Sequence, residues 1–274
     1  MENINIPKRR PGRPRSSSHA VTPSTVNALE RGLLVLQALS REGHIPLTDL
    51  ALSVGVPTST AHRILMTLEK HGFAEMNEDS LEWSVGIESF RVGNAYLEST
   101  DLLEVSRKVM RDLMEDTGET ANLAIADDGD VVFISQVESH NPVRAFFRPG
   151  TRGNMHASGI GKALLSNMLR RDVEKILHNK GCPEFTAQTL VTPAELFRDL
   201  DQTRERGWAL DDEERHEGMR CIASSIFNAY GEAIAGISIS GPSVRFPDSV
   251  LAVLGPRVKQ AADQITGLLG GKLK

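Results

Sequence analysis

Apolar residues recur at helical spacing in three successive runs near the start of the chain. The first run extends from Val26 to Gly43, and its leucines fall three or four positions apart: Leu29, Leu33, Leu36 and Leu39. A shorter run covers 48–54, and a third covers 58–72. In the third run one helical face carries Ala61, Ile64, Leu65 and Leu68. The pattern predicts three helices held together by their apolar faces.

The second and third helices are separated by a glycine, and the third begins with polar residues. Thr48 is placed to cap the second helix, and Gly55 permits a tight turn before the third. A short helix, a glycine turn and an amphipathic helix form the signature of a helix-turn-helix motif. In this motif the first turns of the second helix meet base edges and phosphates in the major groove. We therefore predict a DNA-binding set at Thr48, Thr58, Ser59, Thr60, His62 and Arg63.

Arg63 can donate two hydrogen bonds to guanine, while hydroxyls and a helix N-terminus suit phosphate. The alternative is that Thr58 and Ser59 only cap the helix and that Arg63 is an ordinary solvated residue.

Residues 73–86 predict two short strands around an acidic turn, which is the wing of a winged helix. Because acidic side chains are poor phosphate contacts, we assign the wing to packing, with Trp83 in the core.

Residues 87–101 predict a linker helix, and a second helix follows at 102–117. Beyond Gly118 the pattern changes to short strands separated by Asp/Gly-rich turns. The predicted strands cover 119–128, 130–139, 143–147, 206–214, 219–228 and 233–242, and the predicted helices cover 160–169, 170–179 and 249–269. Strands with helices segregated around them indicate an α+β fold. The expected domains are 1–25, a basic arm; 26–86, DNA-binding; 87–101, a linker; and 102–274, a second domain.

Charge is distributed unevenly along this acidic chain. Residues 1–72 hold nine Lys/Arg and five Asp/Glu (+4), whereas 73–274 hold 22 and 31 (−9). The segment KRRPGRPR in the arm resembles an AT-hook, so Arg10, Arg13 and Arg15 are expected in a DNA minor groove. The alternative is a solvated basic tail. Neither a membrane span nor a signal peptide is apparent, so we expect a cytoplasmic, nucleoid-associated protein.

Five motifs together are similar to the IclR family of bacterial transcription regulators: VNALERGLLVLQAL, VPTSTAHRILMTLEKHGF, MHASGIGKALLS, RGWALDDEERHEGMRCIASSIF and ISISGP. The resemblance covers about residues 26–270. It implies an N-terminal winged helix-turn-helix, a linker helix and a C-terminal effector domain resembling a GAF or profilin-like sandwich. It also implies dimers or dimers of dimers that bind double-stranded operator DNA.

The resemblance places an effector pocket in the second domain. The matching positions are Gly159, Ile160, Asp211, Cys221, Ser238 and Ser240, with Ala145, Phe146 and Phe147 as an apolar wall. Strand periodicity independently puts Ser238 and Ser240 on one face. Helix N–H groups at Gly159 and Ile160 suit a carboxylate. The sequences of these motifs are similar to those of the glyoxylate-responsive branch of the family, so a small 2-oxo acid such as glyoxylate is the expected effector. Ile160 departs from the smaller Ala of close relatives, which favours a very small ligand or a reshaped cavity.

Other functions remain open at this point. Cys221 with His156 or His216 and Asp211 could form a thiol-dependent enzyme site, and Cys221 with the two imidazoles could bind zinc in a metal sensor. No P-loop, G-x-S-x-G or H-E-x-x-H motif is present. An architectural DNA-binding protein without an effector is a further alternative. We expect a regulator rather than an enzyme, with no cofactor and no metal.

Overall fold

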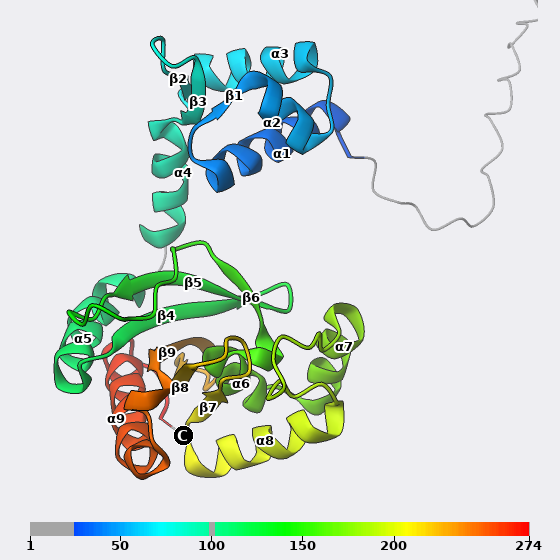
Figure 1. Cartoon of the computed structure of the whole chain (residues 1–274). Coiled ribbons are helices and arrows are strands. Elements are labelled where there is room, and N and C mark those ends of the chain that lie inside the picture. Colours follow the sequence, from blue (N-terminus) through cyan, green and yellow to red (C-terminus); the bar gives the residue numbers. More distant parts are fainter. Residues whose placement is uncertain (1–24, 99–101, 274) are drawn as a thin grey trace, which may run out of the picture. The chain divides into compact units, whose positions relative to one another are not determined.

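The computed structural model describes residues 25–98 and 102–273, and the arm arginines Arg10, Arg13 and Arg15 lie outside this range (Figure 1). The chain divides into two compact units, Met1–Ala95 and Tyr96–Lys274. None of the helices in the described ranges is both long and apolar enough to cross a membrane.

The first unit is a winged helix. Its elements are α1 (Asn27–Glu42), β1 (Ile45–Pro46), α2 (Leu47–Val54), α3 (Thr58–Lys70), β2 (Ala74–Met76), β3 (Glu82–Val85) and α4 (Ile87–Glu98). The three strands form a small antiparallel sheet in the order β1-β3-β2. Gly55 ends α2 with a φ of 71°, which a glycine adopts without strain. The predicted helix-turn-helix and wing are both confirmed.

The core of this unit joins the three helices to the wing. It contains Val35, Ala38, Leu39, Leu50, Leu65 and Trp83. Trp83 is only 2% exposed, as predicted. The expected stripe of α1 is partly wrong, however, because Leu29 and Leu33 are 61% and 50% exposed. Helix α1 instead buries Val35 and Ala38, which leaves its other apolar face uncovered.

The second unit is an antiparallel sheet with helices on both faces, which confirms the α+β class. Its helices are α5 (Leu102–Thr117), α6 (Gly159–Ser166), α7 (Arg170–Lys180), α8 (Pro193–Arg206) and α9 (Asp248–Leu268), with short 3-10 turns η1 (Met155–Ala157) and η2 (Ser243–Arg245). Its strands are β4 (Thr120–Asp127), β5 (Asp130–Val137), β6 (Arg152–Asn154), β7 (Ala209–Asp212), β8 (Met219–Phe227) and β9 (Ala233–Pro242), in the order β6-β5-β4-β9-β8-β7.

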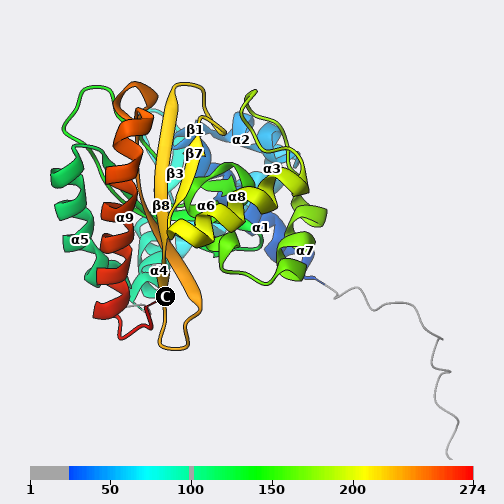
Figure 2. The same cartoon turned by 90° about the horizontal axis from the view of Figure 1, so that it is seen from below.

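Two hydrophobic layers enclose the sheet. Helices α5 and α9 cover one face, and α6, α7 and α8 cover the other (Figure 2). Along β9, Ile237 and Ile239 pack in the α5/α9 layer. Successive side chains of a strand point to opposite faces, so Ser238 and Ser240 face the α6 layer. The strand therefore presents two hydroxyls on the side where α6 begins.

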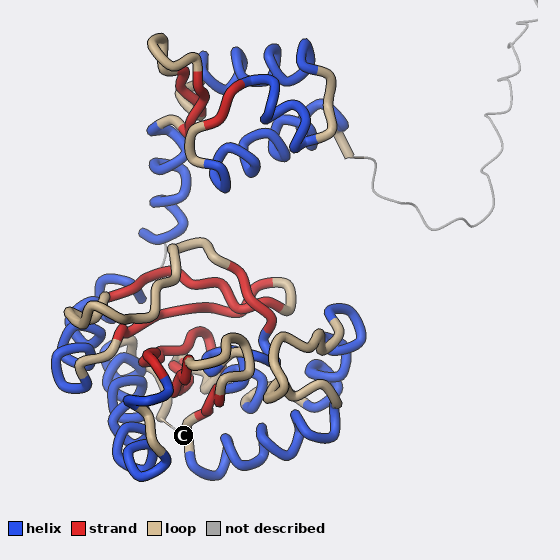
Figure 3. The backbone as a smooth tube through the Cα atoms, in the orientation of Figure 1, coloured by secondary structure: helices blue, strands red, loops and turns tan. Residues whose placement is uncertain are grey.

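Three sequence expectations need correction in this unit. Residues 143–147 are not a strand but an irregular part of the loop between β5 and β6 (Figure 3). Helix α8 and strand β6 were not predicted. The start of α8 nevertheless carries a readable signal, because Thr192 and Glu195 form a capping box and Pro193 occupies the first turn.

Candidate functional site

Helix α3 has one buried face and one exposed face. Ala61 and Leu65 are fully buried, which fixes the helix against its neighbours. The exposed positions recur at helical spacing: Ser59, His62, Arg63, Met66, Thr67 and Lys70. Thr58 is also exposed, whereas Thr60 is half-buried. We did not predict Met66, Thr67 and Lys70 as part of the DNA-binding set, although they lie on the face of the helix opposite the apolar stripe.

The N-terminus of α3 keeps donors available for a phosphate. Its N-cap residue is Pro57, which has no side chain to accept a hydrogen bond. The amides of Thr60 and Ala61 bond to the Pro57 carbonyl at 2.8 and 3.0 Å. The preceding N–H groups of Thr58 and Ser59 have no partner within the helix, and such groups favour anions. The alternative that Thr58 and Ser59 cap this helix is therefore wrong.

Thr48 does not cap α2 either. The N-cap residue is Pro46, so Thr48 lies inside the first turn. Its exposed hydroxyl donates to Oδ1 of Asp49 at 3.3 Å.

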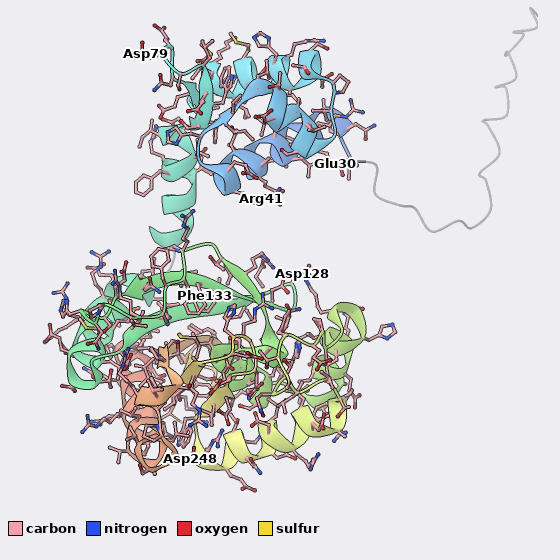
Figure 4. All side chains as sticks on the ribbon, in the orientation of Figure 1. Glu30, Arg41, Asp79, Asp128, Phe133 and Asp248 are labelled. Carbon is pink, nitrogen blue, oxygen red and sulfur yellow. The ribbon has the colours of Figure 1, made fainter. Side chains whose placement is uncertain are left out.

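The wing is acidic, as expected: Glu75, Glu78 and Asp79 are exposed, and Asp79 lies at the hairpin between β2 and β3 (Figure 4).

A cavity of about 430 Å³ lies in the second unit. Its walls come from β5 and β6, from the start of α6, and from strands β7, β8 and β9. It brings together six of the predicted effector residues: Gly159, Ile160, Asp211, Cys221, Ser238 and Ser240. Phe133 of β5, labelled in Figure 4, also lines it, together with Phe146 and Phe147 of the predicted wall. Ala145 is buried but is not part of the lining; its carbonyl accepts a hydrogen bond from Thr120.

Strand register explains why residues distant in sequence meet here. Asp211 pairs with Cys221 across β7 and β8, and Cys221 pairs with Ser240 across β8 and β9. The carboxyl, thiol and hydroxyl groups thus form one row across three strands. Ser238 lies two residues from Ser240 on the same face of β9.

The start of α6 faces this row. The side chain of Ser158 accepts a hydrogen bond from the Gly161 N–H, so the N–H groups of Gly159 and Ile160 remain outside the helix ladder. Gly159 must be a glycine, because an added Cβ would lie 2.8 Å from Cys221 Sγ. The larger Ile160 side chain packs toward Gly236, where an added Cβ would lie 2.6 Å from Ile160 Cγ2. The bulk of Ile160 is thus accommodated by a glycine of β9.

Asn122 of β4 is a site residue that sequence reasoning missed. It is fully buried, and its Nδ2 lies 3.2 Å from Ser240 Oγ and 3.5 Å from Ser238 Oγ. Gln136 Nε2 donates to Asn122 Oδ1 at 2.9 Å, which fixes the amide orientation. Since both hydroxyls accept from Asn122, their own protons can point toward Cys221 Sγ, which is a weak acceptor, or toward a ligand that competes with it. That arrangement favours a ligand that accepts hydrogen bonds.

A buried charge cluster lies behind the cavity. Lys162 of α6 is completely buried and contacts Glu214 and, at 3.1 Å, Asp199 of α8. Burial alone lowers the pKa of Lys162, but the Glu214 and Asp199 carboxylates hold it above its usual value. Burial raises the pKa of Glu214 to about 7 and that of Asp211 to about 6, against the opposing charge of Lys162. The ammonium group of Lys162 therefore interacts electrostatically with three carboxyl groups, those of Glu214, Asp199 and Asp211. Of these three, only Asp211 lines the cavity.

The thiol-enzyme alternative lacks an activated thiol, although Cys221, His216 and Asp211 line the same cavity. Burial, followed by the nearby Asp211, raises the pKa of Cys221 to about 11, so the thiol is protonated near neutral pH. His156 is 2% exposed and its Nε2 donates to the Pro183 carbonyl at 3.1 Å. The metal-sensor alternative lacks a ligand set, because the described residues contain no group of three His, Cys, Asp or Glu side chains that could hold a metal ion.

These features define a DNA-binding winged helix joined in one chain to a domain with a ligand cavity. The family model "Bacterial transcriptional regulator IclR C-terminal" matches residues 94–267, and the model "IclR helix-turn-helix domain" matches residues 28–78. The chain belongs to the IclR family. It is a transcriptional regulator with a DNA-binding domain and a small-molecule effector domain, and not an enzyme.

Relatives match along nearly the whole chain. The HTH-type transcriptional regulator BhcR of Paracoccus denitrificans is 43% identical over 96% of this chain and 95% of its own length. The transcriptional repressor IclR of Escherichia coli K12 is 40% identical over 94% and 96%, respectively. The crystal structure of Thermotoga maritima IclR aligns with a TM-score of 0.75 at 26% identity, covering 89% of this chain and 99% of that one.

Proposed function

We propose that the protein represses a catabolic operon and that a small carboxylate, in the class of 2-oxo acids such as glyoxylate, controls its binding to DNA. The observation that carries the effector class is the row of Asp211, Cys221 and Ser240 facing the start of α6. There the Gly159 and Ile160 N–H groups lie outside the helix ladder, and the Gly159 N–H contacts only the weak acceptor Cys221 Sγ. Helix N–H groups and oriented hydroxyls donate to an oxyanion, and Phe133 and Phe147 supply an apolar wall. The repressor assignment is supported by the name of the Escherichia coli relative.

Calorimetry on the full chain tests the effector class. We expect heat of binding with glyoxylate or pyruvate and none with an aromatic acid such as benzoate. Binding of benzoate without binding of either 2-oxo acid would overturn the assignment. The same titration with a Ser238→Ala/Ser240→Ala double variant should abolish the heat if the acids bind at the hydroxyls.

The DNA-binding residues we propose are Thr58, Ser59, His62 and Arg63 of α3, in the major groove of a near-palindromic operator. Residues 26–86 would form the DNA-binding domain, 87–101 the linker that transmits the ligand state, and 102–274 the effector domain. Their action on bacterial DNA would place the protein in the cytoplasm, at the nucleoid. Fluorescence anisotropy with DNA flanking the protein's own gene tests this: specific binding supports it, and equal affinity for unrelated DNA contradicts it.

The arm is proposed to add minor-groove contacts through Arg10, Arg13 and Arg15. For each phosphate that a basic side chain neutralises, the plot of log affinity against log salt becomes steeper by about 0.9. Deletion of residues 1–20 should therefore weaken binding and make that plot shallower. An unchanged slope would show that the arm does not bind DNA.

A second copy of the chain is the proposed partner of the uncovered apolar faces. Leu29 and Leu33 of α1 are exposed, and Ile87 and Phe90 of α4 are 69% and 66% exposed. Apolar side chains grouped in this way indicate a protein interface, which suits the dimer that a palindromic operator requires. Light scattering should give the molar mass of a dimer or a dimer of dimers. The Leu33→Glu substitution should shift the measured mass toward that of smaller species.

A further inference from the structure

Four arginines line the cavity: Arg148, Arg152, Arg215 and Arg220. Two of them are neutralised by carboxylates. Arg152 Nη1 lies 2.6 Å from Asp127 Oδ2, and its Nε lies 3.1 Å from Asp130 Oδ2. Arg220 Nε lies 2.5 Å from Asp212 Oδ1. These two side chains hold the walls of the cavity together and have little charge left for a ligand.

Arg215 is held without a counter-ion. Its guanidinium carbon lies 3.8 Å from the centre of the Phe185 ring, and Phe185 in turn stacks on His156 at 5.9 Å. The residue is half-buried, its Nη1 atom is enclosed without a hydrogen bond, and no carboxylate of the described chain pairs with it. A partly desolvated cation normally has an anionic partner. Arg148, by contrast, is exposed, so water can solvate its charge.

The cavity lining therefore contains two chemically distinct groups, which we name the hydroxyl end and the arginine end. At the hydroxyl end (Gly159, Cys221, Ser238 and Ser240), the thiol of Cys221 interacts with both serine hydroxyls and the Gly159 N–H. At the arginine end (Arg215 and His216), the guanidinium charge lowers the pKa of His216, after the larger effect of burial. A volume of about 430 Å³ exceeds what one carboxylate group fills. Both ends can thus be occupied by a single ligand.

We propose that the effector carries two acid groups, one held at the hydroxyl end and the other paired with Arg215. This inference rests on the proposed function, since it takes the cavity to bind a carboxylate. The ligand class is a short-chain diacid, including 2-oxo diacids, rather than a monocarboxylic acid alone. Because stacking on Phe185 already restricts the guanidinium, pairing with a ligand carboxylate costs little further side-chain freedom.

The test compares two acids with the same five-carbon chain, 2-oxoglutarate and 2-oxopentanoate, by calorimetry on the full-length protein. Hydrogen bonds between charged groups are worth about tenfold to a hundredfold in affinity. The wild type should bind the diacid tighter than the monoacid by that factor. Arg215→Met keeps the length and the contact with Phe185 but removes the charge, so it should abolish the advantage and leave monoacid affinity unchanged.

Arg198→Met on the exposed surface of α8 is the matched control and should change neither affinity. Arg215→Lys retains charge without the planar stack and should keep part of the advantage, which shows that a loss in Arg215→Met is not a folding defect. Equal binding of the two acids by the wild type overturns the inference, as does equal weakening of both acids by Arg215→Met. If pyruvate binds and alters DNA affinity while the diacid has no advantage, only this inference fails. If no acid binds, the proposed function fails with it.

Discussion

The side-chain amide of Asn122 donates to the hydroxyl of Ser240 at 3.2 Å, linking β4 to β9 beneath the cavity. The hydroxyl thereby uses an acceptor lone pair on the protein, and its proton can point toward the weak acceptor Cys221 Sγ or toward a ligand that replaces it. Gln136 holds the amide in this orientation. The polarity of the cavity floor is therefore set by a residue that does not line it.

Asn122→Leu should weaken carboxylate binding by about fivefold, because an oriented neutral hydrogen bond contributes on the order of 1 kcal/mol. DNA affinity without ligand should be unchanged. Ser225→Ala is a matched control, since Ser225 lies on β8 outside the cavity lining and contacts Asn167 at 3.3 Å. Calorimetry that finds the two variants equally impaired would show that Asn122 acts through general stability.

Carboxylate binding should weaken as pH rises, because Asp211 lines the cavity and ionises there. Its pKa is raised to about 6, mainly by burial. Below this value the neutral acid can lie beside an anionic ligand, and above it the two charges repel. The dissociation constant should therefore increase by up to about tenfold per pH unit above pH 6. Asp211→Asn should flatten the profile, and an unchanged profile in that variant would assign the dependence to another group.

The same shifts predict how stability depends on pH. The folded-state pKa values of Asp211 and Glu214, about 6 and about 7, exceed those of unfolded acids. Their contribution is fully present below the unfolded values, near pH 4, and is lost as pH rises through the folded values. Thermal melting of the wild type should therefore show a decline between about pH 5 and pH 8 that is smaller in Asp211→Asn. A decline of equal size in the variant would contradict the assignment.

Arg63→Ala should cost about 1–3 kcal/mol of operator affinity and relax the preference at one base pair. Lys70→Ala, at the end of the same exposed face, should weaken binding to all sequences alike and reduce the salt slope by about one. Arg41→Ala in α1 is the control, since Arg41 is exposed and its Nε donates to the Gln37 carbonyl. Retention of full specificity by Arg63→Ala in a gel-shift series would remove Arg63 from base recognition.

Gly159→Ala should abolish the ligand response, because its new Cβ would lie 2.8 Å from Cys221 Sγ at the point where α6 approaches β8. Gly153→Ala also lies in the lining, but its Cβ would meet Val131 at an ordinary 3.4 Å, so it should retain the response. Effector titration of the operator complex measures both variants. A normal response in Gly159→Ala would mean that ligand binding does not depend on the close packing of α6 against β8.

Periodicity was sufficient where burial follows a single face. The stripe of Ala61 and Leu65 predicted α3, and the alternation around Ser238 predicted which residues of β9 share a face. In α1 the same reasoning failed for Leu29 and Leu33, because an exposed apolar face has the same spacing along the sequence as a core face. The apolar run at 143–147 failed because its residues lie in a loop instead of pairing with a strand, and two of them, Phe146 and Phe147, line the cavity.

The missed site residues depend on contacts between strands and helices far apart in sequence. Asn122 matters only because β4 pairs with β9 in a register that places it opposite Ser238. Lys162 reads as an exposed helix residue, yet it is buried because Glu214 and Asp199 approach it from β7–β8 and α8. Nothing in the sequence immediately around either position contains that information. Family resemblance supplied the row of Asp211, Cys221 and Ser240, but not the residues that orient it.

The central claim is that ligand in the cavity and operator DNA on α3 control one another. Linkage requires that the ligand change operator affinity by a factor, and that operator change ligand affinity by the same factor. The direct measurement is operator affinity with and without saturating carboxylate, together with carboxylate affinity with and without operator. We predict two matching factors of about 5 to 150 in the wild type, reduced to one in Ser238→Ala/Ser240→Ala. Operator affinity that is independent of a ligand shown to occupy the cavity would contradict the account.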